Sequence, residues 1–433
     1  MTFSLGIDIG TSGVKTATLN AECEIFSTSN IKHIKQNSDK INPSYWWETV
    51  KHAIKLNLIN LNKKGINSFE IKKLAVDGTS GTILLANERL QPVTRALMYD
   101  TTGFRKEAKI IETYSPEQHI AKGQNSTLAR ALKLIAEDKK RAAKFLMHQA
   151  DFIVANFLKK GGFSDHNNTL KLGYNVEKNY WPEWIFKTGL KKNLLPKVFP
   201  VGTKLGKINE TVASELGLDK NTIIYAGTTD SNAGFLSCTN FEKGSAVSSL
   251  GSTLAIKVLS ENQIENAEIG LYSHKIGQYW LAGGASNTGG NVLKKFFNEN
   301  QIVNLSKDID PNSSSGLEYY PLLKMGERFP INDPKLKPRL TPRPQSDSLF
   351  LHGLFESMAK IEKKSYESIY KLGGSFPKHI LTVGGGANNK VWEQIRINVI
   401  KNKNFIRKKY RGSSWNCQDS IFVWIVRILL IIH

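Results

Sequence analysis

The sequence predicts an α/β protein of two similar domains, each built as a mixed sheet flanked by helices. A glycine hairpin between apolar strands occurs within residues 6–15 and again within residues 245–259. A repeat about half a chain apart indicates two related domains, because solenoid repeats recur every ~20–50 residues. The length of 433 residues and the hydrophobic content of 40% allow two cores. We expect one domain over residues 1–232 and the other over 233–433.

The first half predicts the order β-β-β-α-β of a ribonuclease H-like domain. Residues 1–30 contain three stretches of alternating apolar side chains separated by turns, which predicts three strands. Apolar residues at helical spacing predict a helix over residues 45–61, and a strand follows over 71–76. An apolar helix over 152–158 and a strand over 223–225 come later.

The second half repeats this pattern. Strands are expected over residues 247–249, 255–259 and 278–282. A long helix follows, with Leu351, Leu354 and Ile369 on one face. A strand over 380–383 then leads into a glycine run and a helix that starts near Val391.

The first hairpin places one acid, Asp8, just before a glycine turn. Glycines let the backbone approach an anion closely, and free N–H groups beside hydroxyls suit phosphate oxygens. A carboxylate before such a turn suits a hydrated Mg²⁺ ion carried on those phosphates. The alternative is an ordinary hairpin with glycine at its turn. The second copy, Leu250-Gly251-Ser252-Thr253, favours phosphate binding, and two such hairpins facing each other would hold a nucleotide between the domains.

Three further segments place polar groups or glycines after strands. Asp230, in the segment GTTDS, could serve as the base of a phosphoryl transfer or cap the following helix. The segment Asp77-Gly78-Thr79-Ser80 could bind sugar hydroxyls or form a capped turn. The run Gly384-Gly385-Gly386 could lie against an adenine or ribose, or form a strained turn. None of the glycine runs is a P-loop or a GxGxxG motif.

Composition narrows the class of protein. The formal net charge is +21, but the basic residues are spread along the chain, which predicts a solvated basic surface and no nucleic-acid partner. The cysteines form no CxxC pair and the histidines no HExxH motif, so we expect neither a disulfide framework nor a zinc site. No secretion signal is recognisable at the start, and the apolar run 421–432 is shorter than the ~20 residues of a membrane span. We therefore expect a cytoplasmic protein without a membrane partner.

Taken in this order, the motifs resemble those of the FGGY carbohydrate kinases of the actin-like ATPase superfamily. The residues that carry the resemblance are GIDIGTSGVK, GTTDS and GGGANN. The segments VDGTSGTILL, SDHNNTLKLGY and TDSNAGFLS are similar to the xylulokinase-like branch that phosphorylates D-ribulose. The resemblance implies two actin-like domains with a nucleotide cleft between them. It also implies transfer of the γ-phosphate of ATP to a ketopentose. D-ribulose is the expected acceptor and D-xylulose is the alternative.

The resemblance also implies roles for individual residues. Asp8 would position Mg²⁺ through water and contact the sugar, Ser80 would hydrogen-bond the sugar, and Asp230 would accept the proton of the sugar hydroxyl. The remaining implied residues bind ATP: Gly10, Thr11 and Ser12 at the γ-phosphate, Gly251, Ser252 and Thr253 at the other phosphates, and Gly384, Gly385 and Asn389 at adenosine.

After about residue 405 the sequence departs from the family's pattern. The family's last helix begins EAA and continues with small residues, whereas residues 411–420 read RGSSWNCQDS. We hypothesise a single-base frameshift, since codons for GSSWNCQDSIFVW can be chosen that read one base later as EAAGIAKIAFLYG. The alternative is a divergent genuine tail. Loss of a packed helix would weaken stability and ATP affinity, so a decayed pseudokinase is a third interpretation beside the two sugar kinases.

Overall fold

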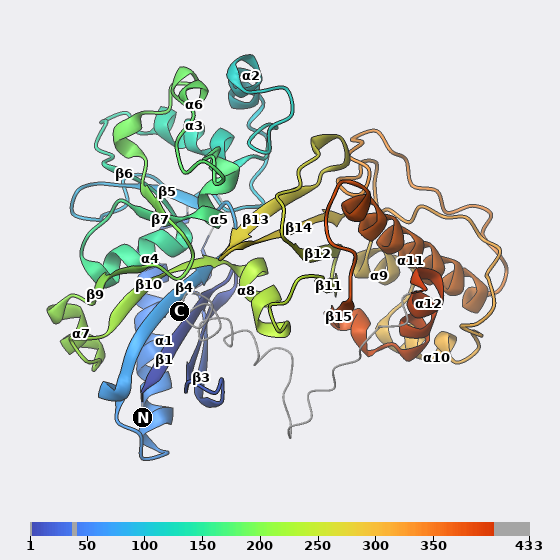
Figure 1. Ribbon diagram of the computed structural model, residues 1–433, viewed down its shortest axis with the longest axis horizontal. Coiled ribbons are helices and arrows are strands. Elements are labelled where there is room, and N and C mark those ends of the chain that lie inside the picture. The colour runs from blue at the N-terminus through green and yellow to red at the C-terminus, as the bar shows by residue number, and fades with distance from the viewer. Residues whose placement is uncertain (1, 37–40, 402–433) are drawn as a thin grey trace. The chain divides into compact units, whose positions relative to one another are not determined.

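The computed structural model describes residues 2–36 and 41–401, which form two compact units (Figure 1). Within these residues the first unit ends at Ser237 and the second begins at Cys238. Helix α8 (Asp230–Cys238) runs across the boundary expected after residue 232. The hypothesis of a frameshift after about residue 405 concerns residues that lie outside the described ones. No helix among residues 2–36 and 41–401 combines the length and the apolar character that crossing a bilayer requires.

The first unit is built on a mixed sheet with the strand order β3-β2-β1-β4-β10-β9. Its strands are β1 (Phe3–Ile9), β2 (Gly13–Leu19), β3 (Ile25–Lys32), β4 (Ile71–Gly78), β9 (Lys204–Lys207) and β10 (Ile223–Thr229). The first three strands form an antiparallel meander, whereas β1, β4 and β10 run parallel to one another. The carboxyl ends of β1, β4 and β10 therefore meet at one edge of the sheet. The three strands predicted within residues 1–30 are confirmed.

Two helices pack on one face of this sheet, α1 (Ser44–Asn62) and α4 (Gln149–Leu158). The buried residues of α1 recur every three to four positions, as the sequence predicted. The rings of Trp47 and Phe157 meet edge to face, 4.9 Å apart, where the two helices approach. Ser27 and Ser29 of β3 donate hydrogen bonds to main-chain carbonyls of α1, which fixes the helix against the sheet.

A separate hydrophobic cluster, which the sequence analysis did not anticipate, lies within residues 83–195. It combines a two-stranded ribbon with short helices. The elements of this part and of the rest of the first unit are β5 (Ile83–Ala86), β6 (Phe145–His148), β7 (Phe163–Asp165), β8 (Lys197–Phe199), α2 (Arg105–Tyr114), α3 (Thr127–Glu137), α5 (His166–Thr169), α6 (Glu183–Lys187) and α7 (Glu210–Leu216).

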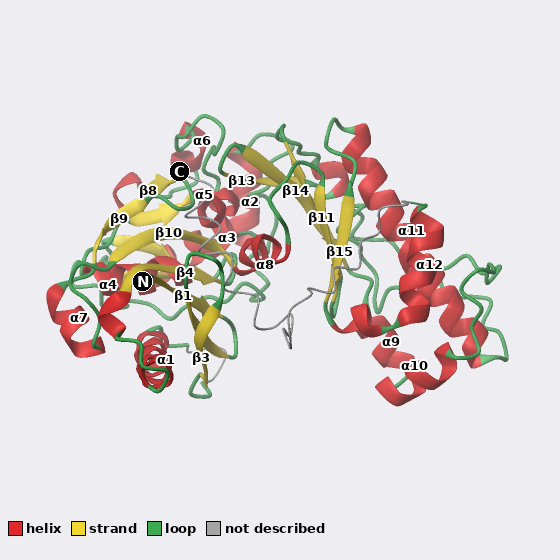
Figure 2. Cartoon of the chain, turned by 60° about the horizontal axis from the view of Figure 1, so that its bottom comes forward, coloured by secondary structure: helices red, strands yellow, loops and turns green. Residues whose placement is uncertain are grey.

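The second unit repeats the sheet pattern of the first with the order β13-β14-β12-β11-β15. Strands β14, β12 and β11 are antiparallel in turn and β15 is parallel to β11, as in β3-β2-β1-β4. Helices α11 and α12 lie side by side along one face (Figure 2). The elements are β11 (Ser245–Leu250), β12 (Leu254–Ser260), β13 (Tyr272–Ile276), β14 (Tyr279–Ser286), β15 (His379–Val383), α9 (Gly290–Phe296), α10 (Glu299–Ser306), α11 (Asp347–Lys371) and α12 (Lys390–Ile400).

Candidate active site

Acidic side chains gather at the edge of the first sheet where β1, β4 and β10 end. Asp8 and Asp77 are direct partners across the parallel pair β1–β4, and Thr228 of β10 is the partner of Asp77 on the other side. Asp230 comes two residues after Thr228 and begins α8. The register of three parallel strands thus brings the expected residues Asp8 and Asp230 to one edge. It adds Asp77, which the sequence analysis had considered only as part of a sugar-binding or capping turn.

Asp8 and Asp77 form a carboxyl pair across the neighbouring strands β1 and β4. Burial raises the pKa of Asp8, while the hydrogen bond from Asp77 and the charge of Lys15 oppose this rise. Lys15 is the partner of Asp8 across the hairpin β1–β2. Asp77 is only 1% exposed, so the pair sits in a weakly hydrated place where a cation or a hydroxyl donor would stabilise both carboxylates.

The turn after β1 is closed and supported from behind. The N–H of Gly10 donates to the carbonyl of Gly13 at 3.0 Å. A Cβ atom at Gly13 would lie 2.4 Å from the carbonyl oxygen of Ile31, so only glycine fits there. The ring Nε2 of His33 lies within hydrogen-bonding distance of the carbonyl oxygen of Gly10, at 3.1 Å. The sequence did not predict this contact, which supports the turn. Thr11 and Ser12 are exposed at the tip of this turn.

Amide and hydroxyl side chains line the ends of β4 and β10. Gln149, the first residue of α4, accepts hydrogen bonds from the backbone and the hydroxyl of Thr79 at 3.1 and 2.6 Å. Asn167 of α5 donates to the hydroxyl of Thr228 at 2.9 Å. The Nε2 of Gln149 and the Oδ1 of Asn167 are buried and have no hydrogen-bond partner among the described residues. Ser80, which the sequence analysis expected at the sugar, lies in the turn after β4 and is partly buried.

A buried acid holds the segment that carries Asn167. Asp165 accepts hydrogen bonds from the backbone N–H groups of Asn167 and Asn168 at 2.8 and 3.1 Å, and from the side chain of Asn168. Burial and the neighbouring charge of Asp151 raise the pKa of Asp165 to about 6, although the hydrogen bonds from Asn167 and Asn168 oppose the rise. Asp165 of the motif SDHNN thereby caps the N-terminus of the short helix α5, which carries Asn167.

The second unit contains a cavity of about 460 Å³ at the ends of β11 and β15. It brings together the expected nucleotide-binding residues Gly251, Ser252, Gly385 and Asn389, from segments more than 130 positions apart. Thr253 and Gly384 adjoin these turns without lining the cavity. The other lining residues are Leu250, Gly290, Leu293, Lys294, Glu299, Ile302, Val303, Phe355, Gly386, Asn388 and Trp392.

One wall of this cavity is formed by aromatic side chains, and its edge is formed by glycine residues, which have no side chains. The rings of Phe355 and Trp392 stack with centroids 4.8 Å apart and planes 9° from parallel. A Cβ atom at Gly384 would lie 2.6 Å from the carbonyl oxygen of Leu250, and one at Gly386 would lie 2.5 Å from the ring of Trp392. The glycines are therefore required for close packing, and together with the apolar wall they leave a slot that suits a flat ring.

The remaining expected residues have structural partners as well. Asn389 caps α12 by accepting from the N–H of Trp392 at 2.9 Å, and its amide donates to Ser306 at 2.8 Å. The carbonyls of Gly251 and Ser252 accept hydrogen bonds from the first two N–H groups of α9 at 2.8 and 3.1 Å. The hairpin turn is thus fixed to the helix that follows β14.

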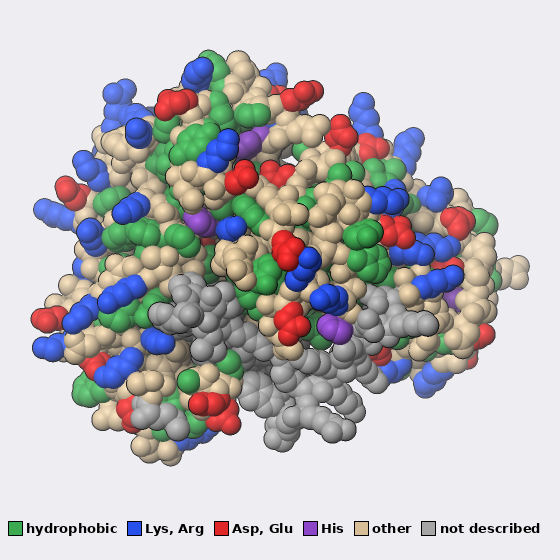
Figure 3. Space-filling view, in the orientation of Figure 1, with side chains coloured by type: hydrophobic (Ala, Val, Ile, Leu, Met, Phe, Trp, Pro, Cys, Tyr) green, Lys and Arg blue, Asp and Glu red, His purple; other side chains and the backbone are tan. Residues whose placement is uncertain are grey.

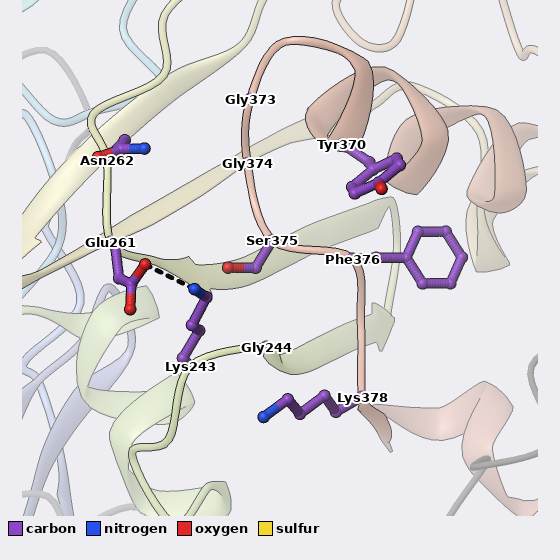
Figure 4. A pocket seen from close by; sticks show the side chains of 10 residues that line it. All are labelled: Lys243, Gly244, Glu261, Asn262, Tyr370, Gly373, Gly374, Ser375, Phe376 and Lys378. Carbon is purple, nitrogen blue, oxygen red and sulfur yellow. Dashed lines mark hydrogen bonds and ion pairs between the residues drawn. The ribbon is translucent and has the colours of Figure 1, made fainter.

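A second hollow, of about 260 Å³, lies at the opposite ends of β11 and β15 and contains none of the expected residues (Figure 4). Lys243 faces into it but is paired with Glu261. Tyr370 and Phe376 meet edge to face on its rim, 5.5 Å apart. Lys378 lines the hollow as well, and the side chains of Tyr370 and Phe376 are exposed, whereas the expected nucleotide-binding residues gather at the larger cavity.

The basic residues are dispersed over the face of the molecule that Figure 3 shows. Lys and Arg side chains are spread over the visible face and intermixed with acidic ones (Figure 3). Such a distribution is typical of a solvated surface rather than a single basic stripe.

Comparisons with known proteins place these features in a family. Residues 3–237 match the model of the N-terminal domain of the FGGY family of carbohydrate kinases, and residues 246–406 match its C-terminal domain. The xylulose kinase of Staphylococcus xylosus is 22% identical, over 96% of this chain and 89% of that protein. Two solved structures from Lactobacillus acidophilus, a xylulose kinase and a gluconate kinase, superpose with TM-scores of 0.81 and 0.80. Each is 14% identical and covers 99% of this chain and 90% of its own. The predicted two-domain α/β fold is confirmed, and the chain belongs to the FGGY family of carbohydrate kinases.

Proposed function

We propose that this chain transfers the γ-phosphate of ATP to a hydroxyl group of a ketopentose, with D-ribulose as the acceptor. The observation that supports the proposal most strongly is the sheet edge where Asp8 and Asp77 lie near the ends of β1 and β4 and Asp230 follows β10. Phosphoryl transfer to an alcohol needs a group that accepts the hydroxyl proton and a cation that neutralises the phosphates. Carboxylates at the ends of rigid strands can meet both needs.

Asp230 is the proposed base. It is partly buried at the start of α8, beside buried Thr228 and Thr229, so the side chain is held by the sheet yet reachable. The buried amides of Gln149 and Asn167, with Ser80, are the proposed partners of the sugar hydroxyls, because a buried polar atom gains most from a hydrogen-bonding ligand. Asp8 contacts the same sugar and orients the cation.

Magnesium is the proposed cation. Hard oxygen ligands suit Mg²⁺, and the Asp8–Asp77 pair supplies two carboxylates side by side. Among the described residues no group of three or more His, Cys, Asp and Glu side chains could hold a metal ion by itself. The ion would therefore arrive with the nucleotide, bound by phosphate oxygens and water, and Asp8 would hold it through water. When bound, it would neutralise charge on the transferred phosphoryl group.

The nucleotide is proposed to bind the second unit. Its adenine would lie against Phe355 and Trp392, with Gly384, Gly385 and Asn389 beside the adenosine and Gly251, Ser252 and Thr253 beside the phosphates. The turn of Gly10, Thr11 and Ser12 in the first unit would contact the γ-phosphate. The N–H groups of Gly10 and Gly251 donate within their own turns, so the hydroxyls and the other N–H groups of these turns would contact the phosphate oxygens.

D-xylulose is the second candidate acceptor, and the names of the curated relatives favour it. The segments VDGTSGTILL and SDHNNTLKLGY favour D-ribulose instead. The fold does not discriminate between acceptors, since the xylulose kinase and the gluconate kinase resemble this chain equally well.

An ATP-consumption assay with both pentuloses tests the proposal. We expect turnover with D-ribulose that exceeds turnover with D-xylulose, and no turnover for Asp230→Ala with unchanged nucleotide affinity. The reverse order of the two sugars would transfer the assignment to D-xylulose. Nucleotide binding without turnover on either sugar would support a pseudokinase, and near-normal kcat in Asp230→Ala would remove Asp230 as the base.

A further inference from the structure

A buried ion pair joins the two longest helices that flank the second sheet. Arg396 of α12 donates to Glu362 of α11 through Nε and Nη2, at 2.6 and 2.7 Å. The same guanidinium donates through Nη1 to the hydroxyl of Thr382 on β15, at 2.7 Å. Arg396 is 0% exposed and Glu362 is 1% exposed. Two parallel hydrogen bonds fix the orientation of both side chains, unlike a single contact.

The pair continues into the strand β11. Ser248 donates to the carboxylate of Glu362 and lies 2.6 Å from the hydroxyl oxygen of Tyr366. Burial and the charge of Glu362 raise the pKa of Tyr366, so this hydroxyl keeps its proton and can donate to Ser248. One network therefore connects β11, β15, α11 and α12.

Each of the four residues Ser248, Thr382, Arg396 and Glu362 lies close along its strand or helix to a residue that lines or adjoins the nucleotide cavity. Ser248 precedes Leu250 by two residues on β11, and Thr382 precedes Gly384 by two residues at the end of β15. The helical members show the same relation, since residues four or seven positions apart share a face. Arg396 is four residues after Trp392, and Glu362 is seven residues after Phe355.

We propose that the Glu362–Arg396 pair positions the nucleotide cavity. It locks the two glycine turns and the stacked rings at the spacing that an adenine nucleotide needs. This inference rests on the proposed function, because it takes the cavity as the ATP site. Glu362 and Arg396 do not line the cavity, so they act through the backbone and rings that do.

A buried ion pair contributes little net stability, because desolvation of both charges offsets their attraction. Specific geometry is therefore a better reason for such a pair than stability. A network that served only to stabilise could be replaced by apolar side chains without affecting the ligand. A network that sets geometry could not.

The test uses the double variant Glu362→Leu with Arg396→Met in the full chain, which removes both charges and keeps similar volumes. We expect a Tm close to that of the unaltered protein and a Kd for ADP, measured by calorimetry without sugar, that rises at least tenfold. In steady state the KM for ATP should rise while the KM for the sugar stays within twofold. A control far from the cavity in sequence replaces the partly exposed pair Arg95–Glu137 of the first unit, which is also held by two hydrogen bonds, by Met and Gln. This control should leave the Kd for ADP unchanged.

Arg396→Lys decides the matter if the double variant does not fold. It keeps the charge beside Glu362 and loses the fork that reaches Thr382, so we expect a folded protein whose Kd for ADP rises at least threefold. An unchanged Kd in either folded variant would overturn the inference and leave the proposed function intact. Failure of the unaltered protein to bind ADP would instead reject the nucleotide assignment itself.

Discussion

Replacing Gly386 by alanine should disturb the aromatic wall of the nucleotide cavity. The added Cβ atom would lie 2.5 Å from Cζ3 of Trp392 and 2.8 Å from Cβ of Leu250. Carbon atoms in favourable contact stay about 3.5–4.0 Å apart, so the indole ring must move by about 1 Å. Trp392 is 2% exposed and stacked on Phe355, which is itself fully buried. The ring can relieve the overlap only by breaking the stack or by entering the cavity.

Overpacking of this kind costs about 1–3 kcal/mol. If the strain is relieved toward the cavity, the same energy opposes the nucleotide and raises the Kd by roughly fivefold to 150-fold. Calorimetric titration with ADP measures the Kd, and thermal unfolding of the free protein measures the stability. Gly385→Ala is the matched stability control, because a Cβ atom there has nothing within 4 Å. An unchanged Tm together with an unchanged Kd in Gly386→Ala would refute the packing argument.

Three other substitutions test the first unit. Gly227→Ala would place a Cβ atom 1.8 Å from the carbonyl oxygen of Val76, so pairing of β10 with β4 should fail and the Tm should fall sharply; a Tm equal to that of the unaltered protein would contradict the register. Burial raises the pKa of Asp165 from 3.8 to about 6, so the folded protein binds this proton more tightly than the unfolded chain does. The stabilisation that the protonated Asp165 carboxyl group provides is complete below pH 3.8 and is lost as the pH rises through 6. The free energy of unfolding then falls by about 2–3 kcal/mol. Urea titrations from pH 4 to pH 7 should show this fall, and Asp165→Asn should remove it; identical profiles would speak against a raised pKa. Asn167→Ala should raise the KM for the sugar several-fold, as expected for one lost hydrogen bond of about 1 kcal/mol, and leave the Kd for ADP unchanged; steady-state kinetics with a raised KM for ATP alone would contradict a sugar-side role.

The sequence predicted what local periodicity encodes. The glycine hairpins, the helix α1 and the long apolar face of α11 follow from patterns within a few residues, and the structure confirms them. Asp77 was recognised as part of a turn, but its pairing with Asp8 depends on the register of two parallel strands 69 positions apart. Sequence patterns carry no register between distant parallel strands.

The Glu362–Arg396 pair was missed because charged residues on helices are usually solvated. One signal could have found it. Arg396 falls on the same helical face as Trp392 and Ile400, the buried face of α12. A charged residue on an apolar stripe requires a buried partner, since an unpaired charge there is very costly. The partner itself could not be identified, because it lies on a different helix.

The two hairpins show how one scaffold carries two kinds of chemistry. Gly10 and Gly251 occupy the same place after their strands, so Ser249 is the counterpart of Asp8. Ser249 is paired with Val383 across the parallel strands, where Asp8 is paired with Asp77. A carboxylate pair would repel a polyphosphate that carries no cation, by about 4 kcal/mol for unit charges 4 Å apart near a protein surface. The corresponding end of the second sheet carries no such carboxylate pair, which supports the proposal that the body of the nucleotide binds there. The acidic end of the first sheet is the better place for a cation and for a hydroxyl group that must lose its proton.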